Sequence, residues 1–100
     1  MIIRGTTPTM TFGLPLETDL FALGYVTIQQ DGETVIEKEL SNCECDGKTV
    51  SAKFTQEETL RLTADKTVEI RLVVKTLGGD RLESKPILDK VFETSKNEVI

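Results

Sequence analysis

Apolar and polar residues alternate along VEIRLVVKT, residues 68–76, and this period of two limits the segment to an extended strand. The set that would share one face is Val68, Ile70, Leu72 and Val74. Charged residues occupy most of the opposite face. Such alternation is typical of a strand with one face in a core and the other in solvent.

Three further segments alternate in the same way. Their apolar sets are Met10, Phe12 and Leu14, then Val26 and Ile28, then Val50, Ala52 and Phe54. TVIEKEL, residues 34–40, is less regular because Lys38 would share a face with Ile36 and Leu40. A β-bulge or an edge position would explain that pattern. Pro86 cannot donate to a ladder, so it predicts an edge strand, a bulge or a break in the last strand.

Glycine-containing pairs mark the connections between these strands. Asp31-Gly32, Asp46-Gly47 and Gly78-Gly79 each supply the positive φ angles that tight hairpins require. Their spacing predicts short strands in antiparallel succession.

A helical turn is predicted in FTQEETLRL. Thr55 as N-cap with Glu58 three residues later forms the pattern of a capping box. A second turn is predicted between Pro15 and Gly24. Either Leu60 or Leu62 should return to the core after the first turn.

These elements predict an all-β fold, a single immunoglobulin-like antiparallel β-sandwich of about 6–7 strands with one short helical turn near residues 55–61. The domain is expected to span residues 1–100, with a polar C-terminal tail at about 93–100. True immunoglobulin domains carry a Cys…Trp…Cys pattern, which is absent because the chain has no tryptophan. A small β-barrel is the alternative.

Charge and composition exclude several function classes. The net charge is −5 and the basic residues are scattered, which is unfavourable for binding nucleic acid. The chain contains no histidine, so the commonest general base and zinc ligand is missing. No apolar run is long enough for a membrane span, and no signal peptide is visible.

Cys43 and Cys45 raise the question of a metal site, a redox pair or simple packing. Residues i and i+2 of a strand lie roughly 6–7 Å apart, which would strain a disulfide between them. A structural zinc site needs four ligands, and the chain offers one cysteine pair. We therefore interpret the two residues as small side chains packed on one face beside a turn, with metal or redox chemistry as the alternative.

The carboxylate pairs do not predict catalysis. Glu37 and Glu39 are expected on a solvated strand edge, and Glu57 and Glu58 at the start of the helical turn. We expect no catalytic residues, no cofactor and no metal, and therefore no enzyme activity.

Apolar residues on nominally outer faces are the remaining candidates for a site. Tyr25, Val73 and Leu77 fall opposite the core sets of their segments. They are interpreted either as partly buried beneath loops or as contacts for another chain.

Four phrases together resemble a known group of proteins. They are RGTTPTMTFGLP, YVTIQQDGETVIEKEL, FTQEETLRL and VEIRLVVKTLGGDRLESKPI. Their order is similar to small phage and prophage proteins of Gram-positive bacteria that are encoded near tail genes, and to the N-terminal domain of phage baseplate upper proteins. The likeness extends from about Arg4 to about Val91. It implies a β-sandwich with a structural or adaptor role in a tail or baseplate.

The function expected from this resemblance is non-enzymatic binding to other protein chains, through an edge strand and an apolar patch. The partners would be phage tail or baseplate proteins or further copies of the chain, with no nucleic acid and no membrane. The expected location is the bacterial host cytoplasm before assembly, with the virion as the alternative. A carbohydrate- or ligand-binding β-sandwich is the rival function.

Overall fold

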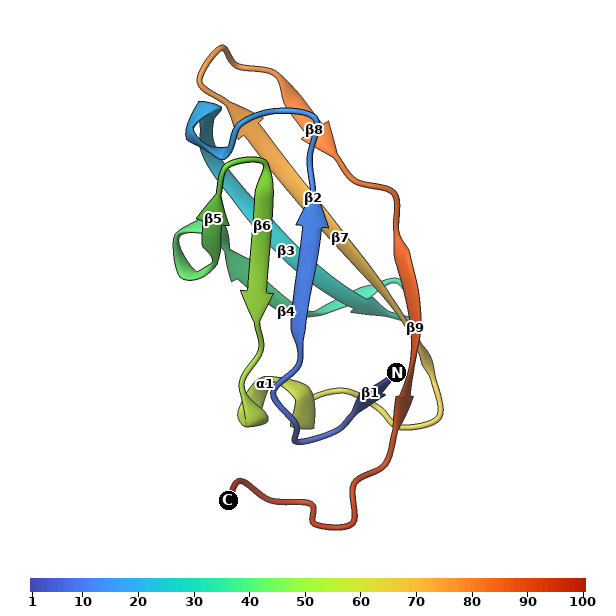
Figure 1. Ribbon diagram of the computed structural model, residues 1–100. Helices are drawn as coiled ribbons and strands as arrows, with labels where there is room; N and C mark the ends of the chain where they lie inside the picture. Colours follow the sequence, from blue (N-terminus) through green and yellow to red (C-terminus); the bar gives the residue numbers. More distant parts are fainter.

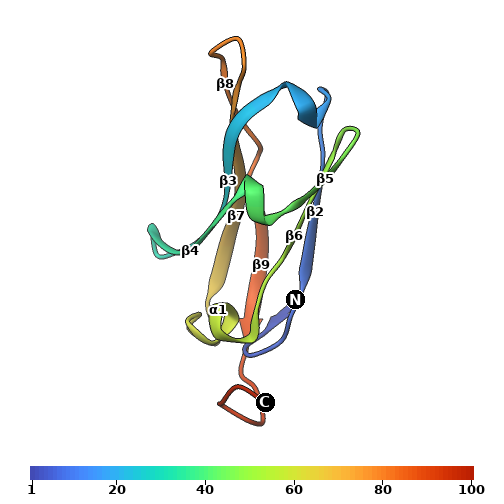
Figure 2. The same ribbon diagram turned by 90° about the vertical axis from the view of Figure 1, so that its left-hand side faces the viewer.

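The computed structural model describes residues 1–100 as two β-sheets packed face to face (Figures 1 and 2). The larger sheet contains β1 (Ile2–Ile3), β3 (Phe21–Gln30), β4 (Glu33–Glu39), β7 (Thr67–Thr76), β8 (Arg81–Glu83) and β9 (Ile87–Phe92). The smaller sheet contains β2 (Thr9–Gly13), β5 (Glu44–Asp46) and β6 (Thr49–Lys53). Short helical turns are η1 (Thr18–Leu20), η2 (Leu40–Asn42) and α1 (Gln56–Leu60).

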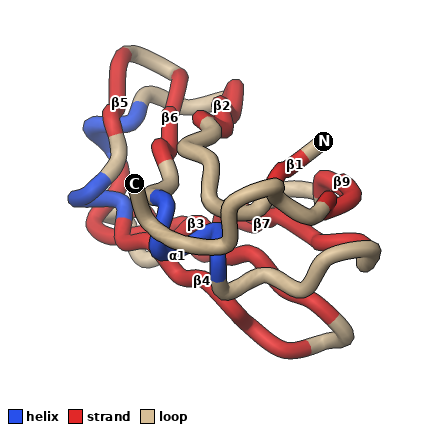
Figure 3. Tube along the Cα trace, turned by 90° about the horizontal axis from the view of Figure 1, so that it is seen from below, coloured by secondary structure: helices blue, strands red, loops and turns tan.

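The strand order confirms the predicted all-β sandwich, with nine strands where about 6–7 were expected. The larger sheet runs β1-β9-β7-β3-β4, with β8 also paired to β7, and the smaller runs β2-β6-β5. The chain changes sheet after β1, β2, β4 and β6. Figure 3 shows the two layers from one end. One pair departs from the antiparallel pattern, because β1 runs parallel to β9 with Ile2 opposite Val91.

The predicted core faces are confirmed by burial. Val68, Ile70, Leu72 and Val74 of β7 are all buried. The other members of the core come from strands of both sheets and from the segments that flank them; they are Ile2, Phe12, Val26, Ile28, Ile36, Val50, Ala52, Phe54, Leu62 and Val91. A single cluster therefore joins the two layers, as expected when each sheet buries one face.

The three predicted turns are also confirmed. Asp31 and Gly32 both have positive φ, at 52° and 79°, in the two-residue connection between β3 and β4. That is the conformation of a type I′ hairpin, whose twist matches its strands. Gly47 and Gly79 have positive φ in the turns that follow β5 and β7.

Two features of β4 account for the irregular alternation of apolar and polar residues in its sequence. It is the last strand of the larger sheet, and its register against β3 shifts between Ile28 and Gln29. Lys38 does share the inner side with Ile36: its side chain is only 12% exposed and its ammonium lies 3.0 Å from Glu58. The ammonium is also 5.5 Å from the centre of the Phe54 ring. A charged residue on the core face is tolerated here because it has a partner.

Glu58 has a second role, in the predicted capping box. The Glu58 amide donates to Thr55 Oγ1 at 3.1 Å, and the Thr55 amide donates to Glu58 Oε1 at 2.9 Å. The same carboxylate oxygen thus joins the start of α1 to Lys38 on β4. The capped turn is thereby attached to the edge of the larger sheet.

Pro86 coincides with an interruption of the last strand. β8 and β9 both pair with β7, but the register changes by one residue between Val73 opposite Glu83 and Ile70 opposite Ile87. Ser84 bridges the interruption, because its hydroxyl accepts the Leu72 amide at 2.9 Å. The predicted break or bulge is confirmed, and it divides one expected strand into two.

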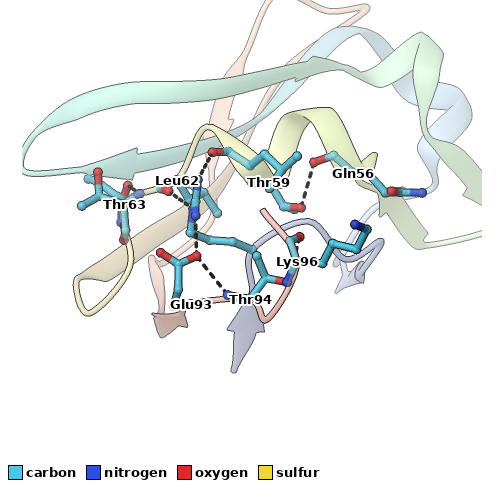
Figure 4. A network of polar contacts seen from close by, with 10 residues as sticks. Gln56, Thr59, Leu62, Thr63, Glu93, Thr94 and Lys96 are labelled. Atoms are coloured by element: carbon cyan, nitrogen blue, oxygen red, sulfur yellow. Dashed lines mark hydrogen bonds and ion pairs between the residues drawn. The ribbon is translucent and has the colours of Figure 1, made fainter. Parts of the chain in front are cut away.

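Polar contacts hold the end of the sandwich that contains α1 (Figure 4). Arg4 donates to the carbonyls of Leu62 and Leu60 at 2.7 and 2.8 Å and pairs with the carboxylate of Glu93. Gln30 accepts from the Thr63 amide at 2.8 Å and donates to the Thr63 carbonyl at 2.9 Å. The segment between α1 and β7 is therefore held by both the N-terminal segment and β3.

The segment after β9 contains no strand and crosses this end of the sandwich (Figure 3). Its last residue is held by α1: the Ile100 amide donates to Gln56 Oε1 at 2.8 Å, and Gln56 Nε2 donates to the Ile100 carbonyl at 3.0 Å.

The Lys38–Glu58 pair makes stability depend on pH. Burial by itself would raise the pKa of Glu58, but the Thr55 amide and the Lys38 ammonium outweigh it and lower that pKa. A carboxylate with a lowered pKa stabilises the fold above its unfolded pKa and loses that effect as the pH falls through its folded pKa. We therefore expect Glu58→Gln to cost about 1.5–3 kcal/mol of unfolding free energy at pH 7, the range for a charged hydrogen bond.

The measurement is urea unfolding of both proteins from pH 7 to pH 3. The difference between them should shrink as the pH falls below about 4.5. Glu57→Gln, which removes the exposed neighbouring carboxylate, is the control and should change little. A difference for Glu58→Gln that stays constant across the pH range would contradict the account.

Candidate functional site

The outer face of the larger sheet carries the clearest candidate site. Side chains alternate between the two faces of a sheet. Because the core residues of β3 and β7 point inward, the residues between them lie side by side on the outer face. Tyr25 lies directly opposite Val73, and Thr27 lies opposite Arg71. Two of the three residues predicted for interaction, Tyr25 and Val73, are thus brought together as a cross-strand pair.

A hollow of about 410 Å³ lies over this pair. Residues that line it include Leu23, Tyr25, Thr27, Arg71, Val73 and Glu83. We call it the Tyr25 hollow. Its position follows from the register, because one cross-strand row places Tyr25 and Val73 between Glu39 of β4 and Glu83 of β8.

Charges of both signs surround the apolar floor of the Tyr25 hollow. Arg71 donates to Gln29 Oε1 at 2.8 Å and lies 2.9 Å from Glu69, so its guanidinium is fixed along the sheet. Exposed charged side chains complete the lining, and these are Glu37, Lys75, Arg81 and Glu83. An apolar centre with a charged rim is the usual composition of a protein contact surface.

Leu77 lies apart from the other two predicted residues. It is 70% exposed in the turn after β7, where its amide donates to the Leu20 carbonyl at 2.8 Å. It does not line the Tyr25 hollow. The structure does not bring it together with Tyr25 and Val73.

Leu23 is a residue of the hollow that sequence reasoning missed. It is 47% exposed and lies two positions before Tyr25 on the outer face of β3. The sequence predicts a helical turn between Pro15 and Gly24, whereas the observed turn ends at Leu20 and β3 begins at Phe21. Continuing the alternation backwards from Tyr25 would have found Leu23.

The two cysteines differ in environment. Cys43 packs partly against the core and its thiol lies 3.5 Å from the Glu39 carbonyl, which fits the packing interpretation. Cys45 is exposed, so packing does not account for it. Both thiols are free, and the structure contains no group of three or more His, Cys, Asp or Glu side chains placed to hold a metal ion.

The paired carboxylates lie where they were predicted. Glu37 and Glu39 project from the edge strand β4 and are exposed, and Glu57 and Glu58 lie in the first turn of α1. Every buried side-chain nitrogen and oxygen has a hydrogen-bond partner.

Comparisons with known proteins found no matching family model, no matching curated protein and no matching solved structure. None of the short helices has the length and apolar character needed to span a bilayer.

The cysteine environments predict two rates of thiol modification. Burial, and then the neighbouring Cys45, raise the pKa of Cys43, so less of it is thiolate at neutral pH. We expect an aromatic disulfide reagent to modify exposed Cys45 first and Cys43 several-fold more slowly. Cys45→Ser should remove only the fast phase, and Cys43→Ser only the slow phase. If both cysteines of the folded protein are modified at one rate, the difference in their environments is wrong. In denaturant, as the control, the two thiols should be modified at equal rates.

Proposed function

We propose that this chain is a non-enzymatic adaptor that binds another protein chain through the Tyr25 hollow. The observation that carries the proposal is the pairing of Tyr25 with Val73 on an outer sheet face that no other element covers. A half-buried tyrosine on a rigid sheet offers a large contact at small entropic cost. Tyrosine is also among the residues that contribute most to protein interfaces.

The mixed charges on the rim favour a protein partner with complementary charges. Glu37 and Glu83 lie on opposite sides of the apolar pair, and Lys75 and Arg81 are close to Glu83 on the β7–β8 side. Such a rim fixes the orientation of a partner and excludes wrong ones more than it adds affinity. A partner with an apolar or aromatic side chain surrounded by polar residues would fit this arrangement.

We propose further that the partner belongs to a phage or prophage tail or baseplate, where the chain has a structural role. The support is the resemblance of the four sequence phrases described above. One of these phrases spans the β3–β4 hairpin and another spans β7 and β8, so the strands that form the hollow are among the resembling segments.

A carbohydrate- or ligand-binding role has less support. The volume of the hollow is within the range of small-ligand sites. However, Tyr25 is the only aromatic residue that lines it. A sugar ring is usually bound against aromatic faces, and Phe12 and Phe54 are buried in the core.

The proposal predicts that changes in the hollow weaken binding. Tyr25→Ala and Val73→Lys should each reduce affinity by about 30-fold, the effect of removing a side chain that contributes about 2 kcal/mol. Light scattering across a concentration range reports self-association, and calorimetric titration with each tail protein encoded by the same genetic element reports binding to a different partner.

Leu77→Ser is the matched control, because it removes an exposed apolar side chain outside the hollow. It should leave affinity within about twofold of the unchanged protein. If Tyr25→Ala and Val73→Lys bind as well as the control, or if the protein is monomeric and binds none of those proteins, the proposal is wrong.

A further inference from the structure

The free edge of β2 carries unused backbone hydrogen-bonding groups. β2 is the last strand of the smaller sheet and pairs only with β6. The Leu14 amide donates to the Lys48 carbonyl at 2.8 Å, and the Phe54 amide donates to the Pro8 carbonyl at 2.9 Å. Every second residue of an antiparallel strand bonds to the same neighbour, so Met10 and Phe12 also bond towards β6.

The alternate residues Thr9, Thr11 and Gly13 therefore direct their N–H and C=O groups away from the sheet. No turn or loop hydrogen bond occupies these groups, and β2 has no neighbouring strand on this side. This side of β2 is open to another strand.

β2 also lacks the charged side chains that protect the other edge strands. No charged residue occurs between Arg4 and Glu17. In contrast, β4 has Glu33, Glu37, Lys38 and Glu39, and β5 has Glu44 and Asp46. Charged residues on an edge strand prevent pairing with other chains. Pro15 is the next residue of the outward series after Gly13 and has no N–H, so it ends the open edge on that side of β2.

An apolar groove of about 350 Å³ lies beside the C-terminal end of β2. Its lining includes Leu14, Phe21, Leu72, Val74 and Leu82, together with the charged residues Glu83 and Lys85. Leu82 is 39% exposed although it lies opposite Val74 on the inner face of the larger sheet. We call this the β2 groove. A strand added to the edge would direct every second side chain to the side where the groove lies.

We propose that the edge of β2 binds an extended, uncharged segment of a partner protein, with apolar side chains at alternate positions, as an additional strand of the smaller sheet. Backbone hydrogen bonds to Thr9, Thr11 and Gly13 would supply affinity, and the β2 groove would select the side chains. The inference rests on the proposed function only in that the ligand is a protein chain. The edge of β2 belongs to the smaller sheet and does not line the Tyr25 hollow, although the hollow and the β2 groove share Val74 and Glu83 in their linings.

A second copy of this chain fits the edge less well. Its own β2 could supply backbone groups, but its Phe12 is 5% exposed and is already part of its core. It would have no free apolar side chain at that position to place in the β2 groove. An extended segment whose apolar side chains are not buried in a core of its own can both bond to the edge of β2 and place those side chains in the β2 groove.

The test is a titration of the ¹⁵N-labelled protein with the synthetic peptide acetyl-KTVTVTVTK-amide, followed by amide NMR shifts. The control peptide is acetyl-KTSTSTSTK-amide, which has the same charge and no apolar side chains. We expect the valine peptide to shift the amides of Thr9, Thr11 and Gly13 and to bind at least about tenfold more tightly than the serine peptide.

Variants of the edge then test the mode of binding. Thr11→Pro removes an outward N–H without removing a bond to β6, and should weaken peptide binding at least about tenfold. Thr11→Val keeps the N–H and should bind within about threefold of the unchanged protein. If Thr11→Pro does not fold, Thr9→Pro makes the same test at the next outward position.

The proposal would be overturned by no binding of the valine peptide, by equal binding of both peptides, by shifts confined to Tyr25 and Val73, or by unchanged binding of the peptide to Thr11→Pro. Concentration-dependent dimerisation that Thr11→Pro abolishes would overturn it in favour of a second copy. Val73→Lys separates the two surfaces, because it should leave peptide binding unchanged whether or not the Tyr25 hollow binds a partner.

Discussion

The antiparallel pairing of β3 with β7 is the contact on which the rest of the structure depends. These are the longest strands, they lie in the middle of the larger sheet, and they pair from Phe21 opposite Thr76 to Gln29 opposite Glu69. Their inner faces provide much of the core. A shift of one residue would move every inward side chain to the outside, so core burial fixes the register strongly. The same register places Tyr25 beside Val73.

Close approach of the two strands depends on Gly24. A Cβ at this position would lie 2.9 Å from Val74 Cγ1 and 3.0 Å from the Val73 carbonyl. The close pairing of β3 with β7 that forms the Tyr25 hollow therefore requires a glycine at position 24, next to Tyr25. The β4 side of the sheet is joined to α1 by the ion pair between Lys38 and Glu58.

The open edge of β2 follows from how the N-terminal segment is used. β1 pairs with β9 in the larger sheet and leaves β2 as the end of the smaller one. The smaller sheet has fewer strands than the sheet it covers, and Leu82 on β8 stays partly exposed as a result. The Tyr25 hollow and the edge of β2 are thus separate surfaces, one on a sheet face and one at the side of the sandwich.

Local patterns in the sequence predicted most of the fold because their causes are local. Alternation gave the strand faces, Asp31-Gly32 gave a hairpin, and Thr55 with Glu58 gave the capped turn. Features that depend on which distant segments meet could not be predicted in this way. The partner of Lys38, the position of Leu77 outside the hollow and the unpaired edge of β2 all depend on strand order and register. These are properties of the assembled sheets and leave no short motif.

Native-state amide hydrogen exchange of the free protein tests directly whether β3 and β7 form the stable centre of the fold and whether the edge of β2 is open. We expect slow exchange across the inner strands β3 and β7. In β2 we expect an alternating pattern, with Met10 and Phe12 protected and Thr9, Thr11 and Gly13 exchanging quickly. Protection of Thr9, Thr11 and Gly13 to the same degree as Met10 would show that the edge is already covered. Such a result would contradict the open edge on which the strand-addition site depends.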